Sequence, residues 1–522
     1  MSLFRTKSVE TMLAEREDSK HSLKRALGAF DLVSIGIGCI IGTGIFVLTG
    51  VAASRYSGPA LVVSFIIAGL ACAFAALAYA EFASMIPLAG SAYTYSYATM
   101  GELIAWIIGW DLILEYGVAA SAVAVGWSGY FTKIMHNWFG IELPAHWVDA
   151  PWMASAIDTP KLIDYFVDPS LWQHFNLLHL FTTATEPTGH YFNLPAAIII
   201  LAITALLVVG IRESANVNTV IVGIKVIVVL FFILLGVWFI KPGNWTPFAP
   251  FGWNGIMTGA AIIFFAYIGF DAVSTASEES KNPQRDLPIG IIGSLIVCTI
   301  LYIAVSAIMT GVVPYKELGT AAPMAYVFES INMGWASGLI SIGAICGITS
   351  VLLVTLYGQS RLFFAMSRDQ LLPKFVAAVH PKFKTPALIT VITGVVMAVL
   401  AAITPIDIIA ELANIGTLFA FALVSAGVVI LRVKRPDVKR VFKCPLVPLI
   451  PALAIIFCFY LMISLPILTW VRFITWLLIG FVIYFTYGYF HSKLAVQPVK
   501  VEEKTENTAE DKANEEPESP KE

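Results

Sequence analysis

Four ionisable side chains lie inside long apolar stretches of this chain, where a charge is unfavourable and is usually retained for a function. They are Asp111, Glu115, Lys225 and Asp271. Asp111 and Glu115 are four residues apart, so both carboxylates project from one face of a helix. Asp111 also fits a simple ion pair near the inner end of its span. Glu115 and Asp271 are therefore the stronger candidates for gating, for proton exchange or for binding a distal cation.

Lys225 lies twelve residues after Glu213, which marks the inner end of the same apolar stretch. Twelve residues of helix measure about 18 Å, farther than a lysine side chain reaches toward water. Burial disfavours the charged form of lysine, so we expect this ammonium to exchange its proton during function. The alternative is a permanently charged lysine held by a carboxylate or by backbone carbonyls.

Glycines interrupt the first apolar stretch, residues 31–53, at its centre. Gly36, Gly38, Gly42 and Gly44 fall within nine residues, although glycine destabilises a helix and permits unusual backbone angles. Unpaired backbone at membrane depth is tolerated only where it faces protein or a water-filled cavity. The pattern predicts a broken helix, although close packing of small residues would also explain the glycines.

The two sides of this break suit the two ends of an α-amino acid. Amides of Gly42, Thr43 and Gly44 begin a half-helix, whose positive end attracts a carboxylate. Carbonyls of Cys39 and Ile40, which end the preceding half-helix, suit an ammonium.

A second break is predicted in residues 264–271, around Gly269. Backbone carbonyls near this break could bind the same ammonium. The candidate substrate residues here are Phe264, Phe265, Ala266 and Ile268. Two broken helices in one chain are typical of a secondary transporter with its site at the bilayer midplane.

Composition requires a membrane protein: 58% of the 522 residues are hydrophobic, only 13% are charged, and the mean hydropathy is +0.80. No disulfide framework is expected from the six cysteines, and no metal-ligand cluster or nucleophile–base motif indicates an enzyme. Twelve apolar stretches predict an all-α fold with twelve spans, at about 30–53, 60–86, 102–132, 194–211, 216–240, 254–279, 288–313, 336–362, 386–404, 406–431, 448–468 and 473–491.

Basic residues gather in the leader and in alternate loops, which predicts cytosolic termini and a cell-membrane location. The predicted broken spans are the first and the sixth. Because five is odd, a repeated five-span unit returns in inverted orientation. The predicted units are a cytosolic leader 1–27, a first repeat 28–240 with an outer insert 136–193, a second repeat 254–431, two extra spans in 448–491 and a disordered cytosolic tail 497–522.

Two further regions carry polar or aromatic side chains. The insert 136–193 has five histidines without tight ligand spacing, so we expect an aromatic cap over the outer face rather than a metal site. Glu81 lies at the inner end of the second span. We expect it to pair with Arg361 or Arg368 as part of an inner gate.

Several motifs resemble the amino acid–polyamine–organocation superfamily. Residues 38–50 (GCIIGTGIFVLTG) resemble its first span, and 79–82, 87–97, 101–102, 269–271 and 278–290 resemble its cationic amino acid transporter branch. The resemblance implies the five-plus-five inverted-repeat (LeuT-like) fold and amino acid uptake by alternating access. It also implies that Lys225 is the lysine that replaces a bound sodium ion in proton-coupled bacterial members.

The resemblance places Thr355 in the span that lines the side-chain pocket, at a position that is small in members with cationic substrates. Neutral and cationic amino acids both remain candidate substrates. Proton-coupled uptake is the leading hypothesis; an exchanger, or a sensor that binds without transport, is the alternative. The expected partners are an amino acid and the lipid bilayer, with no nucleic acid, no cofactor and no metal, the proton being the coupling ion.

Overall fold

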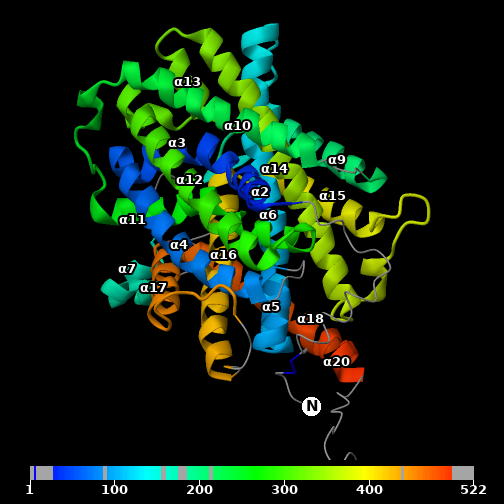
Figure 1. The fold of residues 1–522 in the computed structure, drawn as a ribbon. Coiled ribbons are helices and arrows are strands. Elements are labelled where there is room, and N and C mark those ends of the chain that lie inside the picture. Colours follow the sequence, from blue (N-terminus) through cyan, green and yellow to red (C-terminus); the bar gives the residue numbers. More distant parts are fainter. Residues whose placement is uncertain are drawn as a thin grey trace, which may run out of the picture.

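The structure is a computed structural model that describes residues 5–6, 27–85, 91–154, 160–174, 185–210, 215–434, 436 and 440–496. These residues form a bundle of helices, with one small strand pair (Figure 1). The predicted leader lies mostly outside the described residues, and the predicted tail lies wholly outside them.

The first apolar stretch is broken where its glycines cluster. Helix α2 (Ala29–Ile40) ends because Ile41 adopts an extended backbone, with ψ near 101°. The chain resumes as a wide π turn, η1 (Gly44–Leu48), followed by α3 (Thr49–Ala52) and a second π turn, η2 (Ala53–Ser57). The predicted break of the first span is therefore present.

The second break occurs where the sequence predicts it. Helix α11 (Gly252–Ile263) tightens into η8 (Phe264–Tyr267), and the chain continues after Gly269 as η9 (Phe270–Glu279). Gly269 has φ near +114°, a conformation that side chains with a Cβ rarely adopt. A Cβ atom there would lie 3.0 Å from the Cys39 carbonyl oxygen, so the second break packs directly on the first.

Apolar helix occupies every predicted span. Eight helical stretches of the described residues are long and apolar enough to cross a membrane, and four further apolar helices are shorter. The remaining helices that correspond to predicted spans are α4 (Leu61–Met85), α6 (Glu102–Phe139), α9 (Leu194–Val209), α10 (Ala215–Gly236), α12 (Pro283–Val312), α14 (Gly334–Arg368), α15 (Ala387–Ile403), α16 (Ile406–Lys434), α17 (Leu449–Ile463) and α18 (Ile467–Ile483).

Three short elements continue predicted spans: η6 (Val237–Phe239) follows α10, and η12 (Tyr484–Gly488) and α19 (Tyr489–His491) follow α18. Other short elements lie outside the predicted spans. They are the helices α5 (Ser91–Thr99), α13 (Pro323–Glu329) and α20 (Lys493–Val496), and the 3₁₀ turns η3 (Gly58–Ala60), η7 (Pro242–Trp245), η10 (Tyr315–Leu318) and η11 (Lys374–Ala377).

The long helices pack in two groups. Helix α12 packs on α2 and α4, whereas α14 packs on α6 and α9 lies beside α15 (Figure 1). Helix α10 contacts α2, α12 and α14, and α16 contacts α4 and α6, so these two helices join the groups. Close approach depends on small residues: a Cβ at Gly126 of α6 would lie 2.4 Å from the Thr43 methyl group.

The insert contains the only strands among the described residues, so the all-helical prediction misses a small ribbon. Strand β1 (Trp152–Ala154) pairs antiparallel with β2 (Thr185–Pro187), after the turn η4 (Ala145–Trp147). Between the strands, α7 (Leu162–Val167) and η5 (Pro169–His174) form an excursion. Tyr165 of α7 packs on Ile467 and Leu468, which attaches this excursion to the turn between α17 and α18 (Figure 1).

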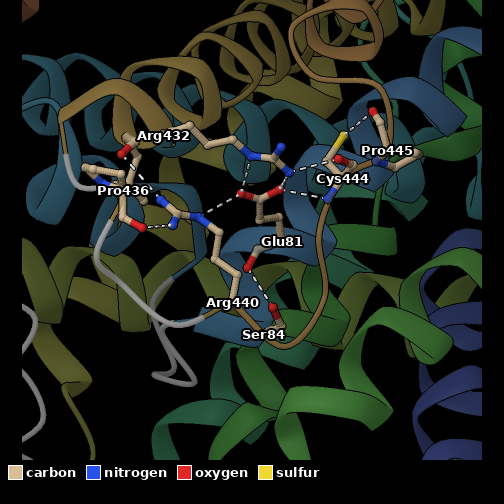
Figure 2. Close-up of polar contacts among 8 residues, drawn as sticks. Glu81, Ser84, Arg432, Pro436, Arg440, Cys444 and Pro445 are labelled. Atoms are coloured by element: carbon tan, nitrogen blue, oxygen red, sulfur yellow. Dashed lines mark hydrogen bonds and ion pairs between the residues drawn. The ribbon is translucent and has the colours of Figure 1, made fainter.

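The inner end of α4 is held by an ion-pair cluster different from the expected one. Glu81 is buried, and its carboxylate accepts hydrogen bonds from Arg432 Nε at 3.1 Å and Nη2 at 2.6 Å. Arg440 Nε lies 3.3 Å from the same carboxylate, and the Cys444 amide donates to it at 2.7 Å. Figure 2 shows both guanidinium groups directed at Glu81. The expected pairing with Arg361 or Arg368 is wrong, because the ion pairs of Glu81 are with Arg432 and Arg440. The Arg361 guanidinium instead lies over the Tyr357 ring.

Replacing Glu81 by alanine should lower the thermal stability of the purified protein. The change leaves two guanidinium groups and one amide without their shared carboxylate, and breaking such a buried pair costs roughly 3 kcal/mol. Differential scanning fluorimetry should show a lower melting temperature for Glu81→Ala than for Glu279→Ala, which removes an exposed carboxylate of η9. Equal melting temperatures would show that the cluster contributes no stability.

Candidate substrate site

A small cavity of about 50 Å³ lies where the two breaks meet. Eight of the ten predicted substrate residues line it, whereas Phe264 and Ala266 do not. Phe264 packs edge-on against Phe421 of α16 at 5.8 Å. The residues that line the cavity are Cys39, Ile40, Gly42, Thr43, Gly44, Tyr116, Ala119, Val123, Phe265, Ile268, Gly269, Ala272, Val351, Val354 and Thr355.

The amide side of the first break is free to bind an anion. Among the described residues, no acceptor bonds the backbone N–H groups of Gly42, Thr43 or Gly44. Thr43 also directs its hydroxyl to the Val123 carbonyl of α6, at 3.4 Å, which orients the turn against that helix. Unpaired amides at the start of a helical segment are a suitable site for a carboxylate.

Carbonyls on the other side of the breaks are tied together by a tyrosine that sequence reasoning missed. The buried Tyr302 hydroxyl of α12 lies 2.9 Å from the Ile40 carbonyl oxygen and 3.0 Å from that of Ala266. Each carbonyl oxygen has a second lone pair that could accept from an ammonium. No sequence pattern indicates this role, because Tyr302 meets the breaks only through the packing of α12.

The glycines of the first break also allow close packing. A Cβ at Gly44 would lie 2.3 Å from the Cα of Ala266, and one at Gly42 would lie 3.1 Å from the Val351 side chain. Both interpretations of the glycine cluster, a broken helix and close packing of small residues, therefore apply. Gly44 lets the two breaks touch, and that contact places the free amides beside the cavity.

Lys225 joins α10 to the first break. Its side chain is fully buried, and Nζ donates a hydrogen bond of 2.6 Å to the Gly38 carbonyl oxygen. Among the described residues, no carboxylate lies within ion-pair distance of this ammonium. The lysine is therefore held by a backbone carbonyl and not by a carboxylate of the described residues.

Three buried carboxylates do not line the cavity, although two of them adjoin residues that do. Asp111, Glu115 and Asp271 are each at most 1% exposed, and the neighbours Tyr116 and Ala272 do line the cavity. Neither Asp111 nor Glu115 has a hydrogen-bond partner among the described residues. Gly416 of α16 makes room for Asp111, since a Cβ there would lie 2.7 Å from its Oδ1.

A larger cavity, of about 450 Å³, lies toward the insert. Its walls include Val47 and Val51 of the first span, Asp149 of the insert and Asp407 of α16. Arg55, at the end of the first span, forms an ion pair with Asp407 in this cavity. Thr43 and Val123 line only the small cavity, whereas Val47 and Val125 line only the larger one. Two adjacent chambers therefore lie along the first span and α6.

Two broken helices, a small cavity where they meet and buried ionisable groups define a multi-pass membrane transporter. A family model described as amino acid permease matches residues 27–487. The chain is 52% identical to the branched-chain amino acid permease BcaP of Bacillus subtilis over 494 residues, covering 94% of this chain and 99% of that protein.

A second Bacillus subtilis protein, the methylthioribose transporter, is 48% identical over 94% of this chain and 99% of that protein. The vacuolar cationic amino acid transporter 4 of Arabidopsis thaliana is 38% identical, over 84% of this chain and 68% of that protein. The chain belongs to the amino acid permease family, and it is a transporter rather than an enzyme.

Removing the Tyr302 hydroxyl should weaken substrate binding. In Tyr302→Phe, no hydroxyl holds the Ile40 and Ala266 carbonyls side by side for the substrate ammonium, and one hydrogen bond of this kind is worth about 0.5–1.5 kcal/mol. Substrate affinity, measured by scintillation proximity, should fall between about 2-fold and 12-fold. The control is Tyr267→Phe, whose hydroxyl donates to the Phe65 carbonyl away from the cavity. Unchanged affinity in Tyr302→Phe would contradict the bridging role.

Proposed function

We propose that this protein is a secondary active transporter that takes up a neutral amino acid together with a proton. The observation that carries the proposal is the buried Lys225 ammonium on the Gly38 carbonyl, 2.6 Å apart. This contact joins a titratable group to the broken segment that lines the cavity. Protonation and substrate occupancy thus act on the same stretch of backbone.

The proposed architecture has twelve spans, with the first ten arranged as two inverted five-span repeats. The positions of the two breaks support it, since they lie five spans apart and contact one another through Gly44 and Ala266. The proposed orientation has both termini in the cytosol of a cell membrane. Basic residues concentrated at the leader and in the α14–α15 and α16–α17 connections support that orientation.

In the proposed binding mode, the substrate carboxylate accepts from the amides of Gly42, Thr43 and Gly44. The substrate ammonium donates to the carbonyls of Ile40 and Ala266, which keep a lone pair beside the Tyr302 bond. A zwitterion then replaces the missing helical hydrogen bonds at both breaks. Substrate binding then stabilises the arrangement in which the two breaks contact one another.

Coupling follows from the protonation of Lys225. The ammonium donates to Gly38 and holds α2 against α10, whereas a neutral amine is a weaker donor and releases that contact. In alternating access, the lysine gains a proton when open to the outside and loses it when open to the cytosol. Substrate and proton stabilise the same state, so each raises the occupancy of the other.

The lining of the cavity supports a neutral aliphatic substrate. Val123, Val351, Val354 and Ile268 supply apolar surface, and Thr355 bonds its own helix carbonyls at 3.0 Å. A branched-chain amino acid permease is among the relatives at 52% identity, which agrees with this class.

A cationic substrate is the second candidate. Asp111 and Glu115 are buried on α6, the helix that also supplies Tyr116 to the cavity, and cationic amino acid transporters are among the relatives. Uptake of lysine or arginine that is lost in Glu115→Gln would favour this second class. Binding without counterflow in proteoliposomes would instead indicate a sensor.

Replacing Lys225 by methionine should abolish uptake driven by a proton gradient, because no titratable group remains at Gly38. Proteoliposomes with wild-type protein should accumulate substrate without sodium and in proportion to an inward proton gradient. Lys225→Met should still exchange substrate but should not accumulate it. Lys241→Met, at an exposed position beyond the same helix, is the control. Gradient-dependent accumulation by Lys225→Met would exclude this lysine as the coupling group.

Enlarging the side chain at 355 should select against large substrates. Thr355→Met fills part of the apolar cavity, and each methylene of mismatch is worth about 1–3 kcal/mol. Leucine and isoleucine uptake should fall at least 10-fold more than alanine uptake. Leu353→Met, on the same helix but outside the lining, should leave the ratio unchanged. Equal losses for all substrates would show that Thr355 does not contact the substrate side chain.

A further inference from the structure

The connection between α16 and α17, together with the adjoining ends of both helices, exposes basic and apolar side chains close together in the sequence. Lys434 and Lys443 are exposed, and neither has an ion-pair partner among the described residues. Exposed apolar side chains alternate with them along the connection. They are Val433 at 77%, Val441 at 50%, Leu446 at 70% and Leu449 at 54% exposure.

The Glu81 cluster determines which basic groups remain available. Arg432 and Arg440 both pair with this one carboxylate, so the cluster keeps a net charge of +1 (Figure 2). Arg440 also donates to the Leu431 and Pro436 carbonyls, each at 3.4 Å, and thereby closes the end of α16. The arginines are thus used to fold the connection, and the lysines are directed outward.

We propose that this surface, defined by Lys434, Lys443, Val433, Val441, Leu446 and Leu449, binds the headgroups of anionic phospholipids. The position at the ends of two apolar helices places it at the membrane interface. The lysines match lipid phosphates, and the excess charge of the Glu81 cluster adds to the same attraction. The apolar side chains match the region just below the headgroups, where amphipathic segments insert.

The acidic tail of the chain itself, residues 502–522, is the other anionic candidate. That tail offers carboxylates but few apolar side chains. It leaves the exposed Val433, Val441, Leu446 and Leu449 in water. A lipid covers both kinds of side chain at once, so the surface composition favours the lipid over the tail.

The expected strength follows from the charge of the two lysines. Each basic group near an anionic membrane surface contributes about 1 kcal/mol, which is roughly a 5-fold change in affinity. Removing both should weaken binding of an anionic lipid about 30-fold. Exposed charges are screened over about 10 Å at 0.1 M salt, so the affinity should also fall as salt rises.

The test is native mass spectrometry of the full-length, delipidated protein titrated with phosphatidylglycerol or phosphatidylcholine. Wild type should retain phosphatidylglycerol in preference to phosphatidylcholine, and Lys434→Gln with Lys443→Gln should lose that preference. The control carries Lys281→Gln with Arg285→Gln, two exposed basic residues of the η9–α12 connection whose exposed neighbours are polar, and it should keep the wild-type preference. A third variant, Val441→Ser with Leu446→Ser, keeps both lysines but loses the apolar contacts. It should therefore also bind less lipid than wild type.

Two results would overturn the proposal. Equal phosphatidylglycerol binding by wild type and the Lys434, Lys443 variant would show that these lysines do not hold the lipid. Zero-length carbodiimide cross-links from Lys434 or Lys443 to tail glutamates, formed in phosphatidylglycerol vesicles, would assign the surface to the acidic tail instead. Circular dichroism and substrate exchange of each variant establish that the protein is folded, so a loss of lipid cannot be attributed to unfolding.

Discussion

Backbone groups cannot be left unpaired in hydrocarbon, and this constraint organises the centre of the protein. Both broken helices expose such groups where they meet, so each must find partners outside its own helix. The Tyr302 hydroxyl and the Lys225 ammonium supply donors to carbonyls of both breaks. The amides of Gly42 to Gly44 keep no described partner, and they face the cavity. In the proposed binding mode a substrate carboxylate satisfies them, which would connect occupancy with the stability of the broken segment.

Packing and binding are therefore consequences of one arrangement. The absent side chain of Gly44 lets the first break touch Ala266, and the left-handed Gly269 brings the second break against Cys39. These contacts bring the ends of four half-helices together around a volume of only about 50 Å³. A small motion of either half-helix changes that volume, so a site of this kind is sensitive to the relative position of the two helix groups.

Buried carboxylates in this protein occupy two contrasting environments. Glu81 contacts two arginines and a backbone amide, which makes it a structural anchor. Asp111 and Glu115 have no described hydrogen-bond partner, although they are equally buried. An anchored carboxylate holds neighbouring elements together, whereas a carboxylate without such donors does not. Burial alone does not distinguish the two roles; the partners do.

The amino-acid sequence by itself determined the helical spans, both breaks and most of the cavity lining, because these depend on apolar length and on clustered glycines along the chain. It also located Lys225 in the interior. Tertiary structure alone decided that Tyr302 bridges the breaks, that Arg432 and Arg440 rather than Arg361 hold Glu81, and that Phe264 and Ala266 lie outside the lining. The physical reason is that these contacts join residues far apart in sequence, so they depend on the register and crossing of packed helices, which no local pattern specifies.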